Sequence, residues 1–254
     1  MDRLDASAIR VPGADVRVVA RCASTNLTLI GERLRRPALL AADEQTAGRG
    51  RRGRRWHSAP GCGVLFSLGL PLQRAARDLG GLSIVAGVAA VRALRALGAD
   101  DAALKWPNDL LARGAKLGGI LVQTRARGAG SAAVIGIGVN YRNAAGLAAR
   151  LRRGVAALED CLQPLPPRNA VIGALARDVL AAVHAFDTKG FEPFRSDWDA
   201  LHAYAGKALR VRLANGRVLA GVAAGLAADG ALQLRTRGGL RVVRSGSVTR
   251  ARPA

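Results

Sequence analysis

The segment from Gly48 to Trp56 threads five arginines through three glycines and ends on a tryptophan. A stretch of this composition has no apolar face to bury, so we expect it to meet solvent or an anion. Glycine lets backbone N–H groups approach a ligand closely, and each guanidinium offers a planar set of donors that fits phosphate or carboxylate. The flat ring of Trp56 could stack on a base. The segment therefore predicts a site for a phosphate-bearing ligand, with a solvated basic loop or an RNA-binding tract as the alternative.

Three further segments combine polar groups with turn-forming or small residues. The run 24–26, Ser-Thr-Asn, is typical of a helix N-cap. The run 105–109 holds a lysine, a Trp-Pro pair and a carboxylate, and its Pro and Asn-Asp residues favour a turn. Lys116, which Gly118 and Gly119 follow, is one of only four lysines beside 35 arginines, and an ordinary surface lysine is its simplest alternative. No Gly-x-x-x-x-Gly-Lys-[Ser/Thr] sequence occurs, so we do not expect ATP to bind through a P-loop.

Length and composition predict a folded chain with a substantial core. The chain has 254 residues, of which 50% are hydrophobic, and a formal net charge of +21. Its basic residues are spread from Arg3 to Arg252 among abundant Ala and Gly, which is more typical of biased coding composition than of a nucleic-acid-binding strip. A binding strip would need the charge gathered on one side of the molecule.

Cysteine, histidine and hydropathy patterns argue against several classes of protein. Cys22, Cys62 and Cys161 are widely separated and lack a Cys-x-x-Cys or His-x-x-x-His companion, so we expect neither disulfides nor a zinc site. The three histidines form no spaced cluster. Early acidic residues and the lack of an apolar stretch before Val16 argue against a signal peptide, and no run of about 18 apolar residues predicts a membrane span. We expect a cytoplasmic protein with reduced thiols.

Apolar periodicity predicts an α+β body followed by a small all-β module. Strands are expected at 16–20, 39–42, 64–70, 103–105, 117–124 and 133–139, and helices at 27–35, 77–97, 169–186 and 191–204. After Gly206 the apolar runs become short, at 209–213, 218–221, 231–234 and 240–243. Three hairpin signals separate them: Asn215-Gly216, Asp229-Gly230 and Gly238-Gly239. The last 50 or so residues therefore predict a β-barrel.

Five separate segments occur in the order found in biotin protein ligases, and the chain resembles this family from about Val16 to its C-terminal β module. Any one segment alone would be weak support, whereas five in the right order make a strong match. The segments are 24–26, 45–56, 105–109, 116–121 and 136–140. The resemblance implies a catalytic domain at 1–205, with a mixed sheet flanked by helices as in class II aminoacyl-tRNA synthetases. It also implies an SH3-like β-barrel at 206–254.

The resemblance implies a two-step ligase reaction. The carboxylate of biotin attacks the α-phosphate of ATP to give biotinyl-5′-AMP and pyrophosphate. The amine of one lysine on a biotin carboxyl carrier protein then attacks the acyl carbon and expels AMP. ATP and biotin are the implied substrates, and Mg²⁺ is expected with the nucleotide, although the sequence does not name its ligands.

The resemblance also implies roles for individual residues. Those matched to biotin contacts are Ser24, Thr25, Asn26, Gln45, Arg49, Gly50, Arg51, Lys116, Gly118 and Gly119. Those matched to the ATP and adenylate side are Arg49, Arg51, Arg52, Arg54, Trp56, Asn108, Lys116 and Asn140. Arg51 and Lys116 are expected to offset the repulsion between carboxylate and phosphates, and Asp109 to accept a proton from, or orient, the incoming lysine amine. The arginine-glycine segment is expected to order over the intermediate and shield it from water.

Further expectations concern partners. Members that repress genes carry an N-terminal helix-turn-helix domain, and only about fifteen residues precede the first expected strand here, so we expect a monofunctional ligase without operator binding. A homodimer through an exposed sheet edge stays open, because edge exposure cannot be read from sequence. The competing hypothesis is a basic protein that binds single-stranded nucleic acid through the arginine-glycine segment and the β module.

Overall fold

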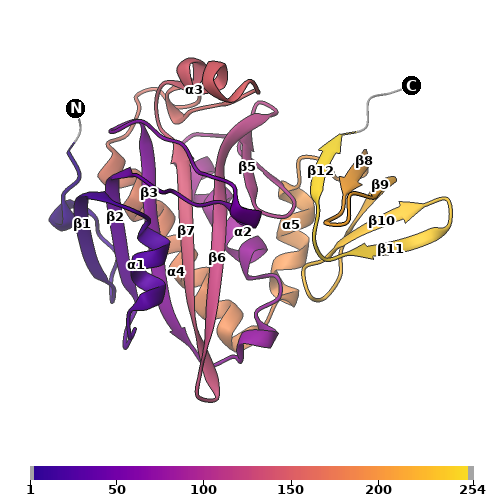
Figure 1. The fold of residues 1–254 in the computed structure, drawn as a ribbon, viewed down its shortest axis with the longest axis horizontal. Coiled ribbons are helices and arrows are strands. Elements are labelled where there is room, and N and C mark those ends of the chain that lie inside the picture. The colour runs from indigo at the N-terminus through magenta and orange to yellow at the C-terminus, as the bar shows by residue number, and fades with distance from the viewer. Residues whose placement is uncertain (1–2, 251–254) are drawn as a thin grey trace.

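Two β-sheets organise residues 3–250, the part of the chain that the computed structural model describes (Figure 1). The larger sheet has seven strands in the order β1-β2-β3-β7-β6-β5-β4. The β1–β2 pair is parallel and the other neighbouring pairs are antiparallel, so the sheet is mixed, as expected. Its strands are β1 (Asp15–Cys22), β2 (Ala38–Gln45), β3 (Gly63–Leu72), β4 (Ala103–Lys105), β5 (Asp109–Ala112), β6 (Ala115–Arg127) and β7 (Gly130–Asn140).

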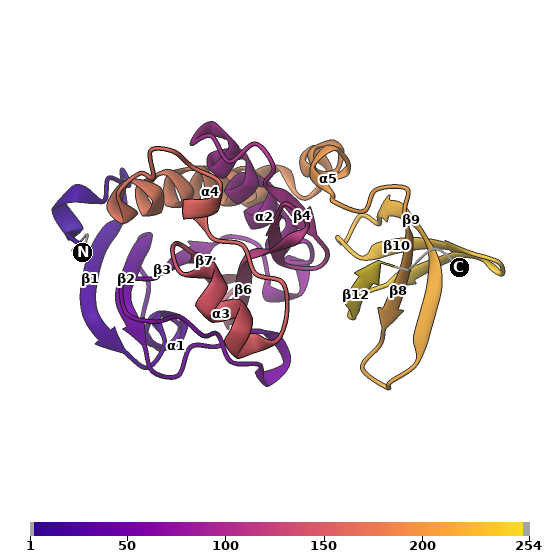
Figure 2. The same ribbon diagram turned by 90° about the horizontal axis from the view of Figure 1, so that it is seen from above.

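Helices cover both faces of the larger sheet (Figure 2). On one face α1 (Thr25–Gly31) packs on β3 and β7. On the other face α2 (Leu82–Ala96) packs on β6, and α4 (Arg168–Lys189) packs on α2 and β3. Because both faces of β3 are covered, nearly all of its side chains are buried, which explains its continuous apolar run at 64–70. Two shorter helices, α3 (Ala144–Leu151) and α5 (Arg195–Leu201), complete the α+β body.

The helix expected at 77–97 begins later than its apolar spacing suggested. Gly81 has a φ of 82°, and a Cβ at this position would lie 2.6 Å from the ring of Phe191. Glycine alone suits both the positive φ and the close approach. The helix therefore begins at Leu82, and only a 3-10 turn at Ala76–Asp78 precedes it, so the prediction for 77–81 is wrong.

Other boundaries also differ from the expectation. The helix expected at 27–35 is α1, which ends at Gly31 because Glu32 has an extended backbone. The helix expected at 191–204 consists of a 3-10 turn at Glu192–Phe194 and then α5. Three short elements have no counterpart among the expected ones: β5, α3 and β12 of the second sheet.

One described helix, α4, is long and apolar enough to cross a membrane by length and composition alone. We expected no such segment. Most of that apolar stretch is buried in the structure, where α4 packs on α2 and β3. These contacts are those of a core helix.

The predicted β module is confirmed as a five-stranded antiparallel sheet in the order β11-β10-β9-β8-β12. Its strands are β8 (Ala208–Arg212), β9 (Val218–Leu226), β10 (Leu232–Thr236), β11 (Gly239–Val243) and β12 (Ser247–Arg250). The three expected hairpin turns join β8 to β9, β9 to β10 and β10 to β11, and each contains a glycine with positive φ. The indole Nε1 of Trp106 ties the two sheets together by donating to the Gly230 carbonyl at 3.2 Å. SH3-like closure of this sheet and the boundary between residues 205 and 206 stay predictions, and residues 251–254 lie outside the described part.

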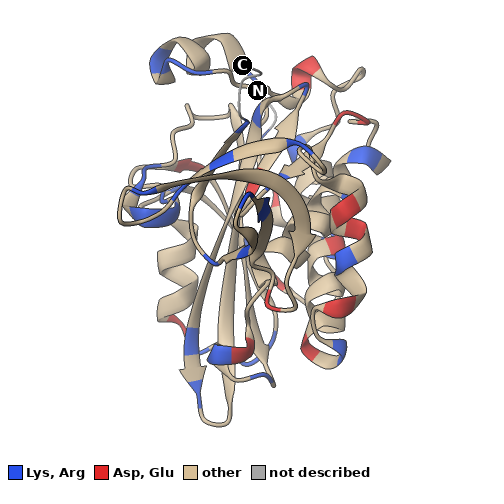
Figure 3. Ribbon diagram, turned by 90° about the vertical axis from the view of Figure 1, so that its right-hand side faces the viewer, with Lys and Arg blue, Asp and Glu red and all other residues tan. Residues whose placement is uncertain are grey.

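Lys and Arg residues are scattered over strands, helices and loops (Figure 3). This distribution agrees with a compositional origin of the positive charge better than with one binding strip. The three cysteines are free thiols in the structure.

Candidate functional site

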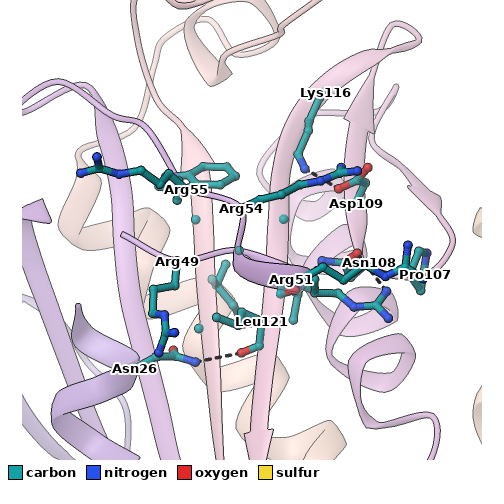
Figure 4. Close-up of a pocket in the computed structure, with 18 of the residues that line it drawn as sticks. Asn26, Arg49, Arg51, Arg54, Arg55, Pro107, Asn108, Asp109, Lys116 and Leu121 are labelled. Carbon is teal, nitrogen blue, oxygen red and sulfur yellow. Dashed lines mark hydrogen bonds and ion pairs between the residues drawn. The ribbon is translucent and has the colours of Figure 1, made fainter. Parts of the chain in front are cut away.

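A cavity beside α1 brings together polar segments that are far apart in the sequence (Figure 4). It encloses about 1090 Å³, counted with its open mouth. Its walls come from the start of α1, the end of β2, the loop 48–56, the turn between β4 and β5, the central strands β6 and β7, and the start of β12. Eight of its lining residues are Arg or Lys, and Asp109 is the one carboxylate among them all.

The loop 48–56, called here the Gly/Arg loop, folds back on itself at the cavity. The N–H of Gly50 donates to the carbonyl of Arg54 at 2.7 Å, and that of Trp56 donates to Gly48 at 2.9 Å. A Cβ at Gly48 would lie 2.9 Å from the Trp56 carbonyl oxygen, so glycine permits the close return of the chain. Figure 4 shows arginines of this compact loop around the cavity.

Arg51 reaches across the cavity to the turn that precedes β5. Its Nη1 lies 3.5 Å from the side-chain oxygen of Asn108. Burial and the neighbouring Arg52 lower the pKa of Arg51, while Asp109 opposes this shift. The guanidinium stays charged, because its ordinary pKa is far above neutrality.

Lys116 and Lys105 share the carboxylate of Asp109. The Lys116 ammonium pairs with Oδ1, and the Lys105 ammonium lies 3.4 Å from Oδ2. Burial would raise the pKa of Asp109, but the charges and hydrogen bonds of the two lysines outweigh it and hold that pKa below its usual value. Burial lowers the pKa of Lys116, and Asp109 offsets part of this shift. The result is a partly buried cation that pairs with a carboxylate oxygen on the cavity wall.

Trp56 packs against β7 at a position that has no side chain. A Cβ at Gly138 of β7 would lie 2.7 Å from Cε2 of the indole. The Lys116 ammonium lies 5.8 Å from the centre of the ring. The Nε1 of Trp56 is buried and has no hydrogen-bond partner among the described residues. The indole therefore keeps a free donor beside a cation.

A second, smaller cavity adjoins the first one. Trp56, Lys116 and Arg153 line both cavities, and Asn140 lines only the second. The Nδ2 of Asn140 donates to the carbonyls of Lys116 and Ala156 at 3.2 and 3.0 Å, which fixes the chain that follows β7 against β6. The indole of Trp56 and the ammonium of Lys116 therefore belong to the walls of both cavities.

The opposite end of the first cavity carries a cluster of hydrogen-bonded polar side chains, called here the polar cluster: Thr25, Asn26, Gln45 and Ser67. Gln45 Oε1 accepts the backbone N–H of Thr25 at 2.9 Å, and the hydroxyls of Thr25 and Ser67 lie 2.6 Å apart. Ser67 donates to Asn26 Oδ1 at 2.6 Å. These four side chains thus form one connected hydrogen-bond network.

The C-terminal sheet closes part of the first cavity. Gly246, Ser247 and Val248 belong to its lining. Arg52 Nη2 donates to the Ser245 hydroxyl at 2.8 Å, and Arg54 Nη2 to the Ser247 hydroxyl at 3.4 Å. The Gly/Arg loop therefore lies between the two sheets.

Most residues matched by the resemblance meet at the first cavity. Fourteen of them line it: Ser24, Thr25, Asn26, Gln45, Arg49, Gly50, Arg51, Arg52, Arg54, Trp56, Asn108, Asp109, Lys116 and Gly119. Asn140 lies in the second cavity. Gly118 lines neither, because it packs within the sheet, where a Cβ would lie 2.7 Å from the Gly138 carbonyl oxygen.

Sequence reasoning missed several residues of the site. Ser67 interrupts the apolar run of β3, and a lone polar residue in a buried strand is a signal that could have found it. Arg153 and Ser247 carry no such signal, since one sits among many arginines and the other follows a turn in a distant domain.

The described residues contain no group of three or more His, Cys, Asp and Glu side chains that could hold a metal ion. The carboxylate of the first cavity is engaged by two lysines. These side chains do not fit a magnesium site made by the protein.

Comparison with known sequences agrees with this geometry. Residues 19–140 match the Biotin/lipoate A/B protein ligase family, and residues 204–249 match the Biotin protein ligase C terminal domain. The chain is 32% identical to the bifunctional ligase/repressor BirA of Escherichia coli over 94% of this chain and 75% of BirA. It is 35% identical to the biotin–[acetyl-CoA-carboxylase] ligase of Paracoccus denitrificans over 91% of this chain and 98% of that protein.

Comparison with solved structures supports the same fold. A biotin protein ligase from Aquifex aeolicus, solved in complex with biotin and ATP, superposes with a TM-score of 0.79 at 23% identity. The match covers 93% of this chain and 99% of that one. The sequence relatives and the two matched domains show that the chain belongs to the biotin protein ligase family.

Proposed function

We propose that this chain is an ATP-dependent ligase that converts biotin to biotinyl-5′-AMP and transfers the biotinyl group to a lysine of a biotin carboxyl carrier protein. The observation that carries the proposal is the meeting of Arg51 and Lys116 at one cavity, each beside a residue of the Asn108–Asp109 pair. Family membership supports the same reaction.

The first step joins two groups of like charge, so its barrier contains a large electrostatic repulsion. A carboxylate oxygen of biotin forms a bond to the α-phosphorus, the bond from that phosphorus to the bridging oxygen breaks, and pyrophosphate leaves. Arg49, Arg51 and Lys116 would neutralise the approaching oxygens, because preorganised cations in a partly buried cavity stabilise charge more than solvent does. Lys116 lies at the junction of the two cavities, so one cation can stay engaged while the negative charge moves.

The two cavities suit the two halves of the intermediate. The polar cluster would hold the ring of biotin, with Ser24 beside it. The second cavity would hold the adenylate, where Trp56 offers a flat ring and Asn140 lines the wall. The Gly/Arg loop would cover the junction and exclude water from the mixed anhydride.

The second step needs a neutral amine at the acyl carbon. The lysine nitrogen of the carrier forms a bond to this carbon, the bond from carbon to the phosphate oxygen breaks, AMP leaves, and the nitrogen loses a proton to the solvent. Both oxygens of Asp109 face lysine ammonium groups, and its pKa is lowered. These facts support Asp109 as a residue that orients Lys116 more than as a proton acceptor.

Magnesium, when bound to the nucleotide, would screen the charge of the phosphates. Because the described side chains do not fit a protein-made magnesium site, we assign no ligand and no step to it. The single-stranded nucleic acid hypothesis loses its basis, since the Gly/Arg loop is folded at the cavity of a family of ligases.

Two expectations remain proposals. β1 is an edge strand of the larger sheet, so it offers an unpaired side on which a homodimer could form. A cytoplasmic location agrees with the three free thiols.

Biotin-dependent release of pyrophosphate from ATP tests the first step, and blotting of a carrier domain with labelled avidin tests the second. We expect the wild type to give both signals and Arg51→Ala to lose most of the first. Arg35→Ala removes the same charge from an exposed position outside the cavity and should behave as the wild type. Absence of biotin-dependent release by the wild type, with tight salt-sensitive binding to single strands, would overturn the proposal.

A further inference from the structure

Two amines of the ligase lie in the cavity where the proposed reaction forms its reactive intermediate. Lys116 belongs to the walls of both cavities, and Lys105 lines the first one. A neutral lysine amine attacks the acyl carbon of a mixed anhydride, as the lysine of the carrier does in the second step. The enzyme therefore holds two potential acceptors of its own beside the bond that it activates.

The other cations of the first cavity do not share this reactivity. They are all arginines: Arg49, Arg51, Arg52, Arg54, Arg55 and Arg153. A guanidinium keeps its protons near neutral pH and is no nucleophile, whereas an ammonium becomes a nucleophilic amine when it loses one proton. Among these eight cations, acylation of the ligase by its own intermediate is thus confined to Lys105 and Lys116.

The surroundings of Lys116 favour loss of its proton. Its side chain is 22% exposed, and burial lowers its pKa. The charges of Arg153 and Lys105 act in the same direction. Asp109 opposes these effects through its charge and through the hydrogen bond that it accepts from the ammonium. Without Asp109, a larger fraction of Lys116 would be neutral at a given pH.

The carboxylate of Asp109 engages both amines at once. Lys105 and Asp109 are opposite each other in the pairing of β4 with β5, and the Lys105 ammonium lies 3.4 Å from Oδ2. The Lys116 ammonium pairs with Oδ1 (Figure 4). The two lysines hold the pKa of Asp109 below its usual value, and the charge of Arg51 acts near it as well. The carboxylate is therefore ionised at neutral pH and has one oxygen for each ammonium.

We propose that Asp109 protects the ligase from its own intermediate by holding Lys105 and Lys116 in the ammonium form, so that neither amine attacks the acyl carbon before the lysine of the carrier arrives. The proposal rests on the proposed function and deepens it, and it makes Lys116 a latent modification site.

The reaction that Asp109 prevents is an acyl transfer to the enzyme. The nitrogen of Lys116 forms a bond to the acyl carbon, the bond from this carbon to the phosphate oxygen breaks, AMP leaves, and the nitrogen loses a proton to the solvent. The product carries biotin in an amide bond on Lys116. This amide has no positive charge, so the modified enzyme would lose the cation that the first step requires.

Peptide mass spectrometry after incubation with saturating synthetic biotinyl-5′-AMP, without a carrier protein, tests the proposal. Because the adenylate is supplied, the result does not depend on the first step. Loss of an opposite charge in contact with a lysine raises its neutral fraction about 10- to 1000-fold. Biotinylation of Lys116 near neutral pH should therefore be at least about tenfold faster in Asp109→Asn than in the wild type.

The other two lysines of the chain serve as an internal control. Lys189 and Lys207 are exposed and line neither cavity. Adenylate that is free in solution should acylate them equally in the wild type and in Asp109→Asn. A rise at Lys116 without a rise at these two positions would place the reaction in the cavity.

Asp101→Asn is the matched control variant, because it removes a carboxylate that pairs with Arg113 at 3.4 Å outside both cavities. It should keep the wild-type rate at Lys116. Asp109→Glu restores a carboxylate and should be biotinylated more slowly at Lys116 than Asp109→Asn. Asp109→Ser also removes the charge and replaces Asp109→Asn if that variant does not fold.

Two results would overturn the proposal alone: biotinylation of Lys116 in Asp109→Asn that is no faster than in the wild type, or an equal rise at Lys116 in Asp101→Asn. Wild-type protein that forms no biotinyl-5′-AMP from biotin and ATP would instead overturn the proposed function, and this proposal with it.

Discussion

Arg52 donates through Nη2 to the hydroxyl of Ser245 at 2.8 Å, although 193 positions separate the two residues. With the contact between Arg54 and Ser247, this pair attaches the Gly/Arg loop to the C-terminal sheet. The groups are exposed, so each contact is worth only about 0.5–1.5 kcal/mol. Their effect would fall on the loop itself, because Arg51 and Trp56 at the cavity depend on its shape.

We predict that the double variant Ser245→Ala, Ser247→Ala raises the KM for ATP about 3- to 10-fold in biotin-dependent pyrophosphate release, with a smaller change in kcat. The Gly/Arg loop would lose its two hydrogen bonds to the C-terminal sheet, while the residues of the larger sheet that line the cavity stay unchanged. Ser196→Ala, an exposed serine on α5, serves as the control. An unchanged KM for ATP would show that the contacts do not hold the loop.

Removal of the Lys116 ammonium should be more severe. Lys116→Met keeps most of the apolar stem and deletes the charge at the junction of the two cavities. We expect the rate of biotinyl-5′-AMP formation to fall about 10²- to 10³-fold, because a partly buried cation at developing charge is lost. Single-turnover formation of the adenylate measures this directly.

Lys189→Met is the control for Lys116→Met, because it removes the same charge from an exposed position at the end of α4. It should leave adenylate formation unchanged. A near-normal rate in Lys116→Met would contradict the role of this lysine while leaving the fold assignment intact.

The pH dependence of the first step should report Lys116. Its pKa lies below the ordinary 10.5 because of burial, which Asp109 partly offsets. The ammonium therefore loses its proton, and the rate should decline, at a pH below 10.5. Asp109→Asn removes the group that raises this pKa. The decline of the rate of adenylate formation at alkaline pH should therefore begin at a lower pH. Adenylate formation measured between about pH 7 and 10.5 checks this, and a decline that begins at the same or a higher pH would contradict it.

The α+β architecture was predictable because the strongest signals are local. The apolar runs of β3, β6 and β7 and the hairpin turns of the second sheet each have a short-range cause. The start of α2 was not predictable, since Gly81 stops the helix through a close contact with Phe191, 110 positions away. β5 has only four residues and little periodicity to detect.

The part of the candidate site in the Gly/Arg loop was predictable, because its run of arginines and glycines alone indicates an anion-binding segment. Contacts that join distant segments were not predictable. The engagement of Asp109 by Lys105 and Lys116 depends on the pairing of β4, β5 and β6. The polar cluster needs Ser67 of β3 to face α1, and nothing near it in the sequence indicates that relationship.

Trp56 contacts β7 at Gly138, where an added side chain would displace the indole. In Gly138→Ala the new Cβ would lie 2.7 Å from Cε2 and 2.9 Å from Cζ2 of the indole, closer than carbon atoms pack. The strand keeps its backbone pairing, and the ring belongs to a loop, so the indole should move rather than the sheet. We expect the KM for ATP to rise about tenfold and stability to fall by about 1–3 kcal/mol.

Pyrophosphate release and thermal unfolding measure the two effects of Gly138→Ala. Gly31→Ala is the matched control, because a Cβ at Gly31 meets nothing within 4 Å and its φ is ordinary. If Gly138→Ala kept the wild-type KM for ATP, the contact between Trp56 and β7 would have no effect on ATP binding. If stability fell without a change in KM, Gly138 would serve only the packing of the loop, and the assignment of Trp56 to the adenylate would fail.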